Sequence, residues 1–294
     1  MTAAYSPEHG VDTGAAVERL LDFLDGRRRP FVLTGAGCST GSGIPDYRDR
    51  DGGWKRSPPI QWQAFRQGEQ TRQRYWARSF VGWPRVAAAS PNAAHHALVE
   101  LERVFPGLPL VTQNVDGLHQ RAGSDDVVDL HGRLDRVICL DCGGAEHRER
   151  FQRRLSRLNP AWGTDDGPIA PDGDVDLGEA DYGRFQIPGC TACGGLVKPD
   201  VVFFGENVPK PRLHQAFGRM EQADAVVVVG SSLMVWSGYR FVRRARELGL
   251  PVAVLNEGRT RADDEIDLKI HACCTQVLPG LARALDAAAP PHPR

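Results

Sequence analysis

The stretch FVLTGAGCSTGSGIPDYRDR, residues 31–50, decides the fold of this 294-residue chain. A short apolar run at residues 31–33 ends in a loop that carries four glycines. Such a loop exposes backbone N–H groups, which can approach the phosphates of a nucleotide. Pro45, Asp46, Tyr47 and Arg48 follow at once. A buried strand that empties into a loop of this kind is typical of the ligand-binding edge of an α/β sheet.

Five further short runs, rich in β-branched or aromatic residues, predict strands at residues 108–114, 126–132, 198–206, 224–232 and 250–256. Between several of these strands lie stretches whose apolar residues have helical spacing, at residues 93–105 and 238–249. A further helix is expected at residues 15–25, before the first strand. Apolar strands that alternate with helices indicate an α/β fold with a parallel sheet buried on both faces.

The unusual residues of this pattern lie at the carboxyl ends of the predicted strands. They are Gly35 and its loop, residues 113–116, His131, Glu206, residues 230–232 and Asn256. Any one of them is explained by an ordinary turn. Because the carboxyl ends of parallel strands meet at one edge, their repetition predicts a ligand crevice there.

The charge balance excludes some classes of partner. The chain has 36 basic and 37 acidic residues and a net charge of -1, which gives no electrostatic reason to bind nucleic acid or an anionic membrane. Its longest apolar run, near residues 225–230, falls short of the roughly 20 residues that span a bilayer. Residues 1–14 have the pattern of neither a signal nor a transit peptide. We therefore expect a cytoplasmic protein with no nucleic-acid or membrane partner.

Two regions break the α/β alternation. Residues 51–86 are rich in Trp and Arg and predict a helical excursion over the sheet. Residues 136–196 contain two CxxC pairs and a long stretch dense in Gly, Pro and Asp, which predicts a small loop-rich inserted domain. Within it, the acidic stretch DGDVDLGE at 172–179 lacks the glycine position of a calcium loop, so we expect a solvated acidic loop.

The CxxC pairs carry the strongest single signal. Two thiolates three residues apart can hold one ion, and two such pairs complete a tetrahedral sulfur site suited to zinc. A redox dithiol or two disulfides is the alternative. Four protein ligands leave no open position, so this zinc would be structural. The ligands are Cys139, Cys142, Cys190 and Cys193.

The glycine loop does not match the dinucleotide fingerprint GxGxxG. After Gly35 and Gly37 the third position holds Thr40, and Gly41 comes one residue late. A dinucleotide remains plausible, but not in the pose of a dehydrogenase.

Three polar side chains at the ends of neighbouring predicted strands, those of Asn114, Asp116 and His131, are candidates for catalytic and binding roles. A histidine can titrate near neutrality, which suits His131 to general-base work on a hydroxyl. Asn114 and Asp116 offer an amide and a carboxylate that could bind an amide such as nicotinamide. We expect Cys38 to be a small packing residue, and the histidines at 95, 96, 119 and 271 to be structural.

Taken in order, the glycine loop, GIPDYR, TQNVD, LHG, the paired CxxC, KPDVVFFGE, GSS and LN resemble the sirtuin family of NAD-dependent protein deacylases. The resemblance runs from about residue 15 to residue 285. The stretches RQRYWARSFVGWP, LNPAW, APDGDV and SSLMVWSGYRF are most similar to class II sirtuins, the mitochondrial lipoamidase and ADP-ribosyltransferase branch.

The resemblance implies a domain organisation. Residues 13–50, 87–135 and 197–285 would form a Rossmann-like NAD-binding domain, with residues 51–86 as a helical module. Residues 136–196 would form the structural zinc domain. Residues 1–12 and 286–294 would be flexible tails.

The resemblance also implies the binding residues. The pyrophosphate and the nicotinamide ribose would contact Gly35, Ala36, Gly37, Asp46, Tyr47 and Arg48. The nicotinamide pocket would be lined by Gln113, Asn114 and Asp116. The adenosine half would contact Gly230, Ser231, Ser232, Asn256, Glu257, Gly258 and Cys274.

The implied reaction consumes NAD as a co-substrate. The carbonyl oxygen of an acyl-lysine on a protein substrate attacks the ribose, nicotinamide leaves and an alkylamidate forms. His131 then takes a proton from a ribose hydroxyl, which attacks the amidate carbon. Free lysine, nicotinamide and acyl-ADP-ribose result.

Two segments are candidates for the acylated-lysine substrate. The extended residues Val202, Phe203, Phe204, Gly205 and Glu206 could pair with a substrate peptide by β-augmentation, or could be a simple core strand. Tyr75 and Arg78 share a helical face and resemble the pair that reads acidic acyl tails in desuccinylase relatives. They would favour glutaryl-like or lipoyl-like chains over acetyl, or else belong to a surface helix.

Three other functions compete with the deacylase. A mono-ADP-ribosyltransferase would leave ADP-ribose on protein. A sensor would bind NAD or ADP-ribose without turnover, although the intact His131, Asn114 and Asp116 argue against it. An NAD-dependent dehydrogenase is disfavoured by the broken fingerprint.

Overall fold

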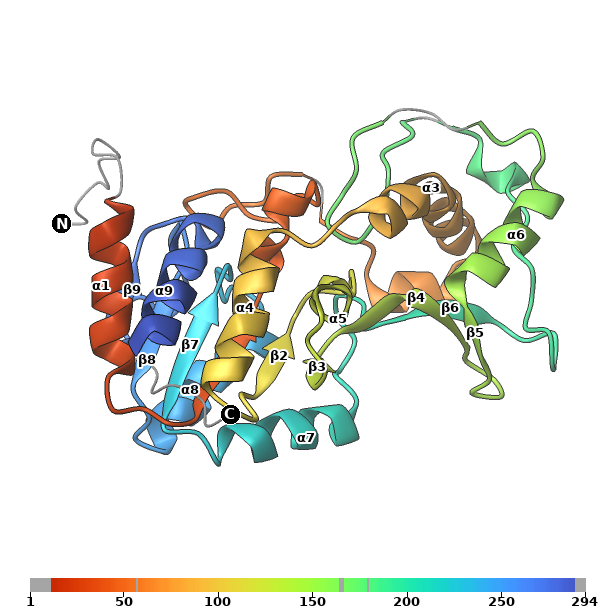
Figure 1. The fold of residues 1–294 in the computed structure, drawn as a ribbon. Helices are drawn as coiled ribbons and strands as arrows, with labels where there is room; N and C mark the ends of the chain where they lie inside the picture. The colour runs from red at the N-terminus through yellow and green to blue at the C-terminus, as the bar shows by residue number, and fades with distance from the viewer. Residues whose placement is uncertain (1–11, 57, 164–166, 179, 289–294) are drawn as a thin grey trace, which may run out of the picture.

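The fold is known from a computed structural model that describes residues 12–56, 58–163, 167–178 and 180–288. Figure 1 shows two lobes side by side, which the chain enters and leaves more than once. The larger lobe contains a parallel sheet between two layers of helices, and the smaller lobe contains a short antiparallel sheet.

The larger sheet has the order β3-β2-β1-β7-β8-β9 among the described residues. Every neighbouring pair is parallel. The strands are β1 (Pro30–Thr34), β2 (Leu110–Thr112), β3 (Val127–Asp129), β7 (Ala225–Val229), β8 (Val252–Leu255) and β9 (Leu268–Ile270). The strand order changes direction between β1 and β7, so the topological switch point lies there, and a ligand crevice is expected outside the carboxyl ends of these two strands.

Helices cover both faces of this sheet because alternate side chains of each strand point to opposite sides. Val32 of β1 packs with α1 (Thr13–Leu24), α4 (Ala93–Val104) and α9 (Cys274–Ala288). Phe31 and Leu33 pack with α7 (Lys210–Met220) and α8 (Trp236–Glu247) on the other face. The predicted α/β fold with a doubly buried parallel sheet is confirmed.

The smaller lobe contains the antiparallel sheet β5-β4-β6, with β4 (Gly132–Cys139), β5 (Ala145–His147) and β6 (Val197–Val201). The helices α2 (Trp62–Gln67), α3 (Glu69–Ala88) and α6 (Arg148–Leu158) pack with it around the buried ring of Trp76. In the part of the chain that the structure describes, the remaining elements are α5 (Leu118–Ala122) and three short 3-10 helices, Ala36–Cys38, Thr40–Ser42 and Tyr182–Arg184. The helical excursion predicted for residues 51–86 is thus present as α2 and α3.

One predicted strand joins a different sheet. Residues 198–206 were expected in the parallel sheet, and this is wrong, because β6 pairs with β4 in the smaller lobe. A short apolar run does not disclose which sheet it joins, and here Val197 packs with Val137 of β4 in the smaller core. The sixth parallel strand is instead β9, three residues long, which has no run of its own in the sequence.

The predicted domain limits stay predictions, although three elements cross them. Helix α3 continues to Ala88, past the limit drawn between residues 86 and 87. Strand β4 begins at Gly132, before the limit drawn at residue 136, and α9 continues to Ala288, past the tail expected from residue 286. The tails otherwise lie mostly outside the described residues.

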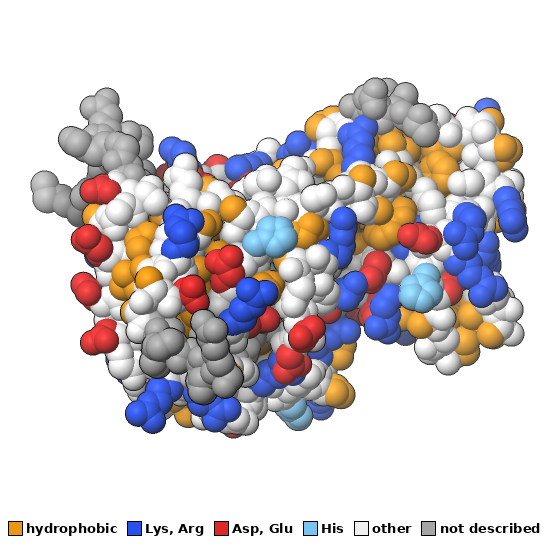
Figure 2. Space-filling view, viewed as in Figure 1, with side chains coloured by type: hydrophobic (Ala, Val, Ile, Leu, Met, Phe, Trp, Pro, Cys, Tyr) orange, Lys and Arg blue, Asp and Glu red, His pale blue; other side chains and the backbone are white. Residues whose placement is uncertain are grey.

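The surface agrees with the near-zero net charge. On the face in Figure 2, acidic and basic side chains are interspersed over the larger lobe, and basic ones gather on the smaller lobe. The exposed arginines of α6 at positions 150, 153 and 157 belong to that lobe. No helix within the described ranges has the length and apolarity required to cross a bilayer.

Two buried histidines join β1, α4 and α5. His95 and His119 are almost fully buried with ring centroids 4.8 Å apart. The backbone N–H of Asn92 donates to Nδ1 of His95 over 3.3 Å, and Nε2 of His119 lies 2.9 Å from Oγ1 of Thr34. Burial lowers the pKa of His95 to about 4 and that of His119 to about 3. Both are therefore neutral packing residues, as the sequence suggested.

These two histidines should make stability pH-dependent. Both histidines have a lower pKa in the folded protein than in the unfolded chain, where it is about 6.5. The free energy of unfolding is therefore at its full value above about pH 6.5 and decreases as the pH falls towards 4. At pH 5 each histidine should lower the free energy of unfolding by about 2 kcal/mol. This value is about 1.36 kcal/mol per pH unit, taken over the roughly 1.5 units between pH 6.5 and pH 5. Urea unfolding at pH 6.5 and 5 should show a smaller pH-dependent loss in His119→Gln than in the wild type. The exposed His214→Gln serves as the control, and equal losses in all three proteins would contradict the assignment.

Candidate active site

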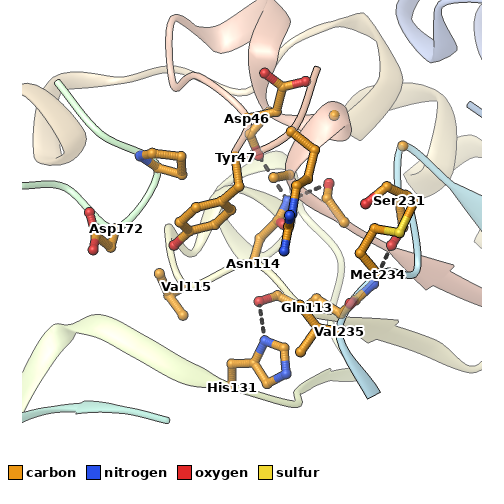
Figure 3. A pocket seen from close by; sticks show the side chains of 18 of the residues that line it. Asp46, Tyr47, Gln113, Asn114, Val115, His131, Asp172, Ser231, Met234 and Val235 are labelled. Carbon is orange, nitrogen blue, oxygen red and sulfur yellow. Dashed lines mark hydrogen bonds between the residues drawn. The ribbon is translucent and has the colours of Figure 1, made fainter. Parts of the chain in front are cut away.

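One cavity of about 780 Å³ lies at the carboxyl edge of the parallel sheet and extends between the lobes. This volume is within the range of small-molecule sites. Figure 3 shows side chains from several separate segments converging on it. Among the predicted residues that line it are Gly35, Ala36, Gly37, Asp46, Tyr47, Arg48, Gln113, Asn114, Asp116, His131, Gly230, Ser231, Ser232, Asn256, Glu257, Gly258 and Cys274. Their contacts with NAD stay a prediction.

The glycines of the loop after β1 allow a close backbone contact with the loop after β7. Gly37 donates its N–H to the carbonyl of Gly230 over 2.8 Å. A Cβ on Gly35 would lie 2.6 Å from Cβ of Ser231, and a Cβ on Gly230 would lie 2.4 Å from the nitrogen of Cys38. Gly230 also has φ of 59°, which disfavours other residues. These glycines therefore bring two strand-end loops together at the switch point.

Asn114 and Asp116 hold the glycine loop from the neighbouring strand. Asn114 donates through Nδ2 to the carbonyl of Gly35 and to Oγ of Ser39, each over 3.0 Å. The Ser39 hydroxyl in turn donates to Oδ2 of Asp116 over 2.7 Å, and Oδ1 of Asp116 accepts from the N–H of Leu118. Burial is the main cause that raises the pKa of Asp116. Both oxygens of this carboxyl thus have protein partners, and the network fixes the shape of the loop.

His131 is held from both ring nitrogens. Nδ1 lies 2.8 Å from the carbonyl oxygen of Gln113, and Nε2 lies 2.8 Å from Oγ of Ser237; Figure 3 shows the first of these bonds. A carbonyl oxygen only accepts, so the ring carries its proton on Nδ1 and presents the lone pair of Nε2. Burial, with a smaller effect of Arg212, lowers the pKa of His131 to about 4. The ring is therefore neutral at pH 7 and able to accept a proton.

The segment after the glycine loop folds over the cavity through aromatic contacts. The guanidinium of Arg48 lies 3.4 Å from the ring centroid of Trp54, and this side chain also donates to the carbonyl of Gly52. Tyr47 contacts Phe204 edge to face with centroids 5.6 Å apart. Asp46 is paired with Lys55. These contacts draw residues 46–55 over one side of the cavity.

The loop after β8 forms a further part of the cavity wall and contacts the segment 46–55 at Arg50. Asn256 donates through Nδ2 to the carbonyl of Gly258 over 3.0 Å, and a Cβ on Gly258 would lie 2.8 Å from Cα of Arg50. Glu257 and Arg50 form an exposed ion pair at 3.9 Å. Cys274 is buried at the start of α9, with Sγ 3.6 Å from the carbonyl of Gly37.

The segment from Val202 to Glu206 lies along the cavity and is only partly free to pair with a peptide. Val202 donates its N–H to the carbonyl of His131 over 2.7 Å, and Phe203 donates to the carboxylate of Glu206. Glu206 also pairs with the buried ammonium of Lys198 at 2.8 Å. The carbonyl of Phe204 also accepts from the N–H of Trp62 over 2.8 Å. This segment is therefore anchored to His131, to Trp62 and to its own turn, and Phe203 packs in the smaller core.

Tyr75 and Arg78 do not act as a pair at the cavity. Tyr75 lines the cavity, and its buried hydroxyl has no hydrogen-bond partner within the described residues. The Nε of Arg78 lies 3.1 Å from Oδ2 of Asp174 and donates to the carbonyl of Val175. Arg78 is not among the lining residues.

The prediction of a solvated acidic loop at 172–179 is wrong for two of its acids. Asp174 is 5% exposed because it pairs with Arg78 of α3. Asp172 lines the cavity, with one carboxyl oxygen buried and without a partner in the described chain. The loop approaches α3 at Gly82, where a Cβ would lie 2.1 Å from the carbonyl oxygen of Gly173. Glu179 lies outside the described residues.

The four predicted zinc ligands meet at one end of the smaller lobe. Their ligand atoms lie within 4.8 Å of one another, with Sγ–Sγ distances of 3.6 Å between Cys139 and Cys193 and 3.7 Å between Cys142 and Cys190. A tetrahedron with metal–sulfur bonds of about 2.3 Å has edges of about 3.8 Å. All four are free thiols rather than disulfides. The donor set fits a structural zinc ion that would join β4 to the segment before β6.

Sequence reasoning missed several residues of this site. Ser39, Trp54 and Ser237 have side-chain contacts that only the folded chain reveals. The position of Ser39 inside the quoted glycine loop was the one available signal for it. Ser237 lies 106 residues after His131, so no local pattern could have joined them.

Comparisons with known proteins identify the family. The sequence profile described as the Sir2 family matches residues 35–237. A protein named "NAD-dependent protein deacetylase" from Xanthomonas campestris pv. campestris (strain 8004) is 55% identical over 276 residues, which are 94% of this chain and 93% of that protein. The "NAD-dependent protein deacylase Sirt4" of Drosophila melanogaster is 48% identical over 94% of this chain and 90% of its own. A solved structure described as "Sir2-p53 peptide-NAD+" has 30% identity and a TM-score of 0.69, and the match covers 92% of this chain and 98% of that one.

The chain therefore belongs to the Sir2, or sirtuin, family. The prediction of an NAD-dependent sirtuin enzyme, made from eight motifs in order, is confirmed. The predicted structural zinc agrees with the geometry of the four-cysteine cluster.

Removal of one zinc ligand should disturb the smaller lobe. Cys142→Ser leaves three thiolates, so elemental analysis should show loss of the single zinc ion that we expect per wild-type chain, and limited proteolysis should cleave faster within residues 136–196. Cys273→Ser changes a thiol outside the cluster and should keep the metal. Full zinc occupancy in Cys142→Ser would contradict the four-thiolate site.

Proposed function

We propose that this protein is an NAD-dependent protein lysine deacylase that releases nicotinamide and acyl-ADP-ribose. The observation that carries the proposal is the state of His131. A neutral ring with its proton on Nδ1 and its lone pair directed from Nε2 is the form that a general base needs. The names of the relatives, which include deacetylases and a deacylase, support the same reaction class.

The residues around His131 would bind NAD and exclude water from it. The loop that Asn114 and Asp116 hold in shape would bind the pyrophosphate and ribose of NAD through its backbone N–H groups. Residues 46–55 would cover the co-substrate and exclude water. NAD supplies the electrophilic ribose carbon, and His131 would take the proton of the attacking ribose hydroxyl.

The peptide would lie along Val202–Glu206. The backbone groups of this segment that are not bonded to His131, Trp62 or Glu206 would pair with the substrate main chain. Such pairing supplies affinity with little dependence on substrate side chains, so several acylated proteins would be substrates. The cytoplasm is the proposed compartment, and the free thiols support a reducing one.

We also propose that acyl chains longer than acetyl are accepted. Phe203, Tyr75 and Asp172 all line the cavity, and the space between them would hold such a tail. The unpartnered hydroxyl of Tyr75 would hydrogen-bond a polar group on that tail. An acidic tail such as glutaryl would bind Arg78 only after Arg78 left Asp174. A neutral tail such as lipoyl needs no such change.

The activity is tested by mass spectrometry of the purified protein incubated with NAD and peptides bearing acetyl-, glutaryl- or lipoyl-lysine. Wild-type protein should form acyl-ADP-ribose, and His131→Ala should lower its rate by about 10²–10⁴-fold, the usual contribution of a general base. His214→Ala, on an exposed position of α7, should keep the wild-type rate. ADP-ribose left on protein would favour a mono-ADP-ribosyltransferase, and NAD binding without products would favour a sensor.

The acyl pocket is tested by removal of one hydroxyl. Tyr75→Phe should lower kcat/KM for the polar-tailed acyl peptides by about 5- to 10-fold, the effect of one buried hydrogen bond, and leave that for acetyl peptide unchanged. The double variant Tyr75→Phe, Arg78→Met should lower the glutaryl rate further if Arg78 turns into the cavity. An unchanged ranking of the three acyl groups in both variants would contradict the pocket.

A further inference from the structure

The imidazole of His131 is held by hydrogen bonds with two segments that contact each other, the one after β2 and the start of α8. Gln113 follows β2 and binds Nδ1 of His131 through its backbone carbonyl, whereas Ser237 lies in the first turn of α8 and binds Nε2. A Cβ on Gly238, the next residue, would lie 2.3 Å from Oε1 of Gln113. This close approach fixes the first turn of α8 against the residue that orients the other side of the imidazole.

The loop before Ser237 is tied to the same group of residues. Gln113 donates through Nε2 to Oγ of Ser231 over 2.8 Å, and that oxygen also accepts from the N–H of Leu233. Leu233 has φ of 56°, the one positive value among the described residues other than glycine. The loop thus turns sharply and leads directly to Ser237 at the cavity wall.

The hydrogen bond from Ser237 is made to Nε2 of His131, the same atom that must accept the proton in the reaction. Because Nδ1 of His131 carries the ring proton, Nε2 has a lone pair and Ser237 must donate its hydroxyl hydrogen. That lone pair is the acceptor for the proton of the ribose hydroxyl. A serine hydroxyl rotates freely and both donates and accepts, so it can serve the ring in either protonation state.

We propose that Ser237 is a positioning residue for His131. The Ser237 hydroxyl donates to Nε2 in the resting protein and accepts from Nε2–H once the ring holds a second proton. This inference rests on the proposed deacylase function. In the step concerned, the Ser237 hydroxyl first turns its hydrogen away from Nε2 and frees the lone pair. The O–H bond of the ribose hydroxyl then breaks, its proton forms the N–H bond at Nε2, and its electron pair forms the new bond to the acyl carbon. Ser237 gains and loses no proton. Its oxygen stabilises the imidazolium by a charge-assisted hydrogen bond.

The proposal separates two steps of the reaction. Nicotinamide leaves before His131 acts, so the reversible exchange of free labelled nicotinamide into NAD should not need Ser237. Formation of acyl-ADP-ribose should need it. A residue that merely supported the cavity would affect both steps alike.

The test compares Ser237→Ala and Ser237→Thr with the wild-type protein, with acetyl-lysine peptide as the substrate. Ser237→Ala should lower kcat for acyl-ADP-ribose formation by about 10- to 100-fold, the effect of one hydrogen bond to a charged group, while nicotinamide exchange stays within about twofold. Ser237→Thr keeps an Oγ atom and should recover most of the rate. In ¹⁵N-labelled protein, the Nε2 resonance of His131 should shift in Ser237→Ala while the proton stays on Nδ1.

The outcomes are distinguishable from failure of the proposed function. A wild-type protein that forms no acyl-ADP-ribose contradicts the deacylase itself. An active wild-type protein with an equally active Ser237→Ala overturns the role of Ser237. An equal loss in exchange and in product formation also overturns it, because that result indicates a structural role.

Discussion

The backbone contact between the loops after β1 and β7 is the constraint on which the site depends. The N–H of Gly35 bonds to the carbonyl of Val229, and the N–H of Gly37 bonds to that of Gly230, over 3.0 and 2.8 Å. A Cβ on Gly35 or on Gly230 would collide with the opposite loop. Two strands that neighbour each other in the sheet thus open into loops that remain in contact, and the crevice forms above them.

The rest of the site is held by polar contacts that reach this junction. Ser39 joins the glycine loop to Asp116, and Gln113 joins Ser231 to His131. The side chains that would bind the co-substrate therefore have fixed positions before any ligand arrives, which reduces the cost of ordering them on binding. The smaller lobe lines another part of the cavity with Tyr75 and Phe203, and a zinc ion held by the four cysteines would stabilise that lobe.

The sequence was informative where a residue type has one strong physical reason. Glycines in a strand-end loop, paired CxxC motifs and runs of valine predicted the junction, the metal cluster and the parallel sheet. It was uninformative where a partner lies far along the chain. The segment 198–206 joined the smaller sheet, Asp174 was buried by Arg78, and Ser237 met His131, because tertiary packing decided each case.

The central claim is that four separated segments at the carboxyl edge of one sheet form a single NAD site. Hydrogen exchange measured by mass spectrometry, with and without saturating NAD, tests this claim directly. The account predicts slower exchange in peptides that cover residues 35–48, 113–116, 230–232 and 256–258, and unchanged exchange around the exposed face of α6. Protection confined to the smaller lobe, or no protection at any of the four segments, would contradict it.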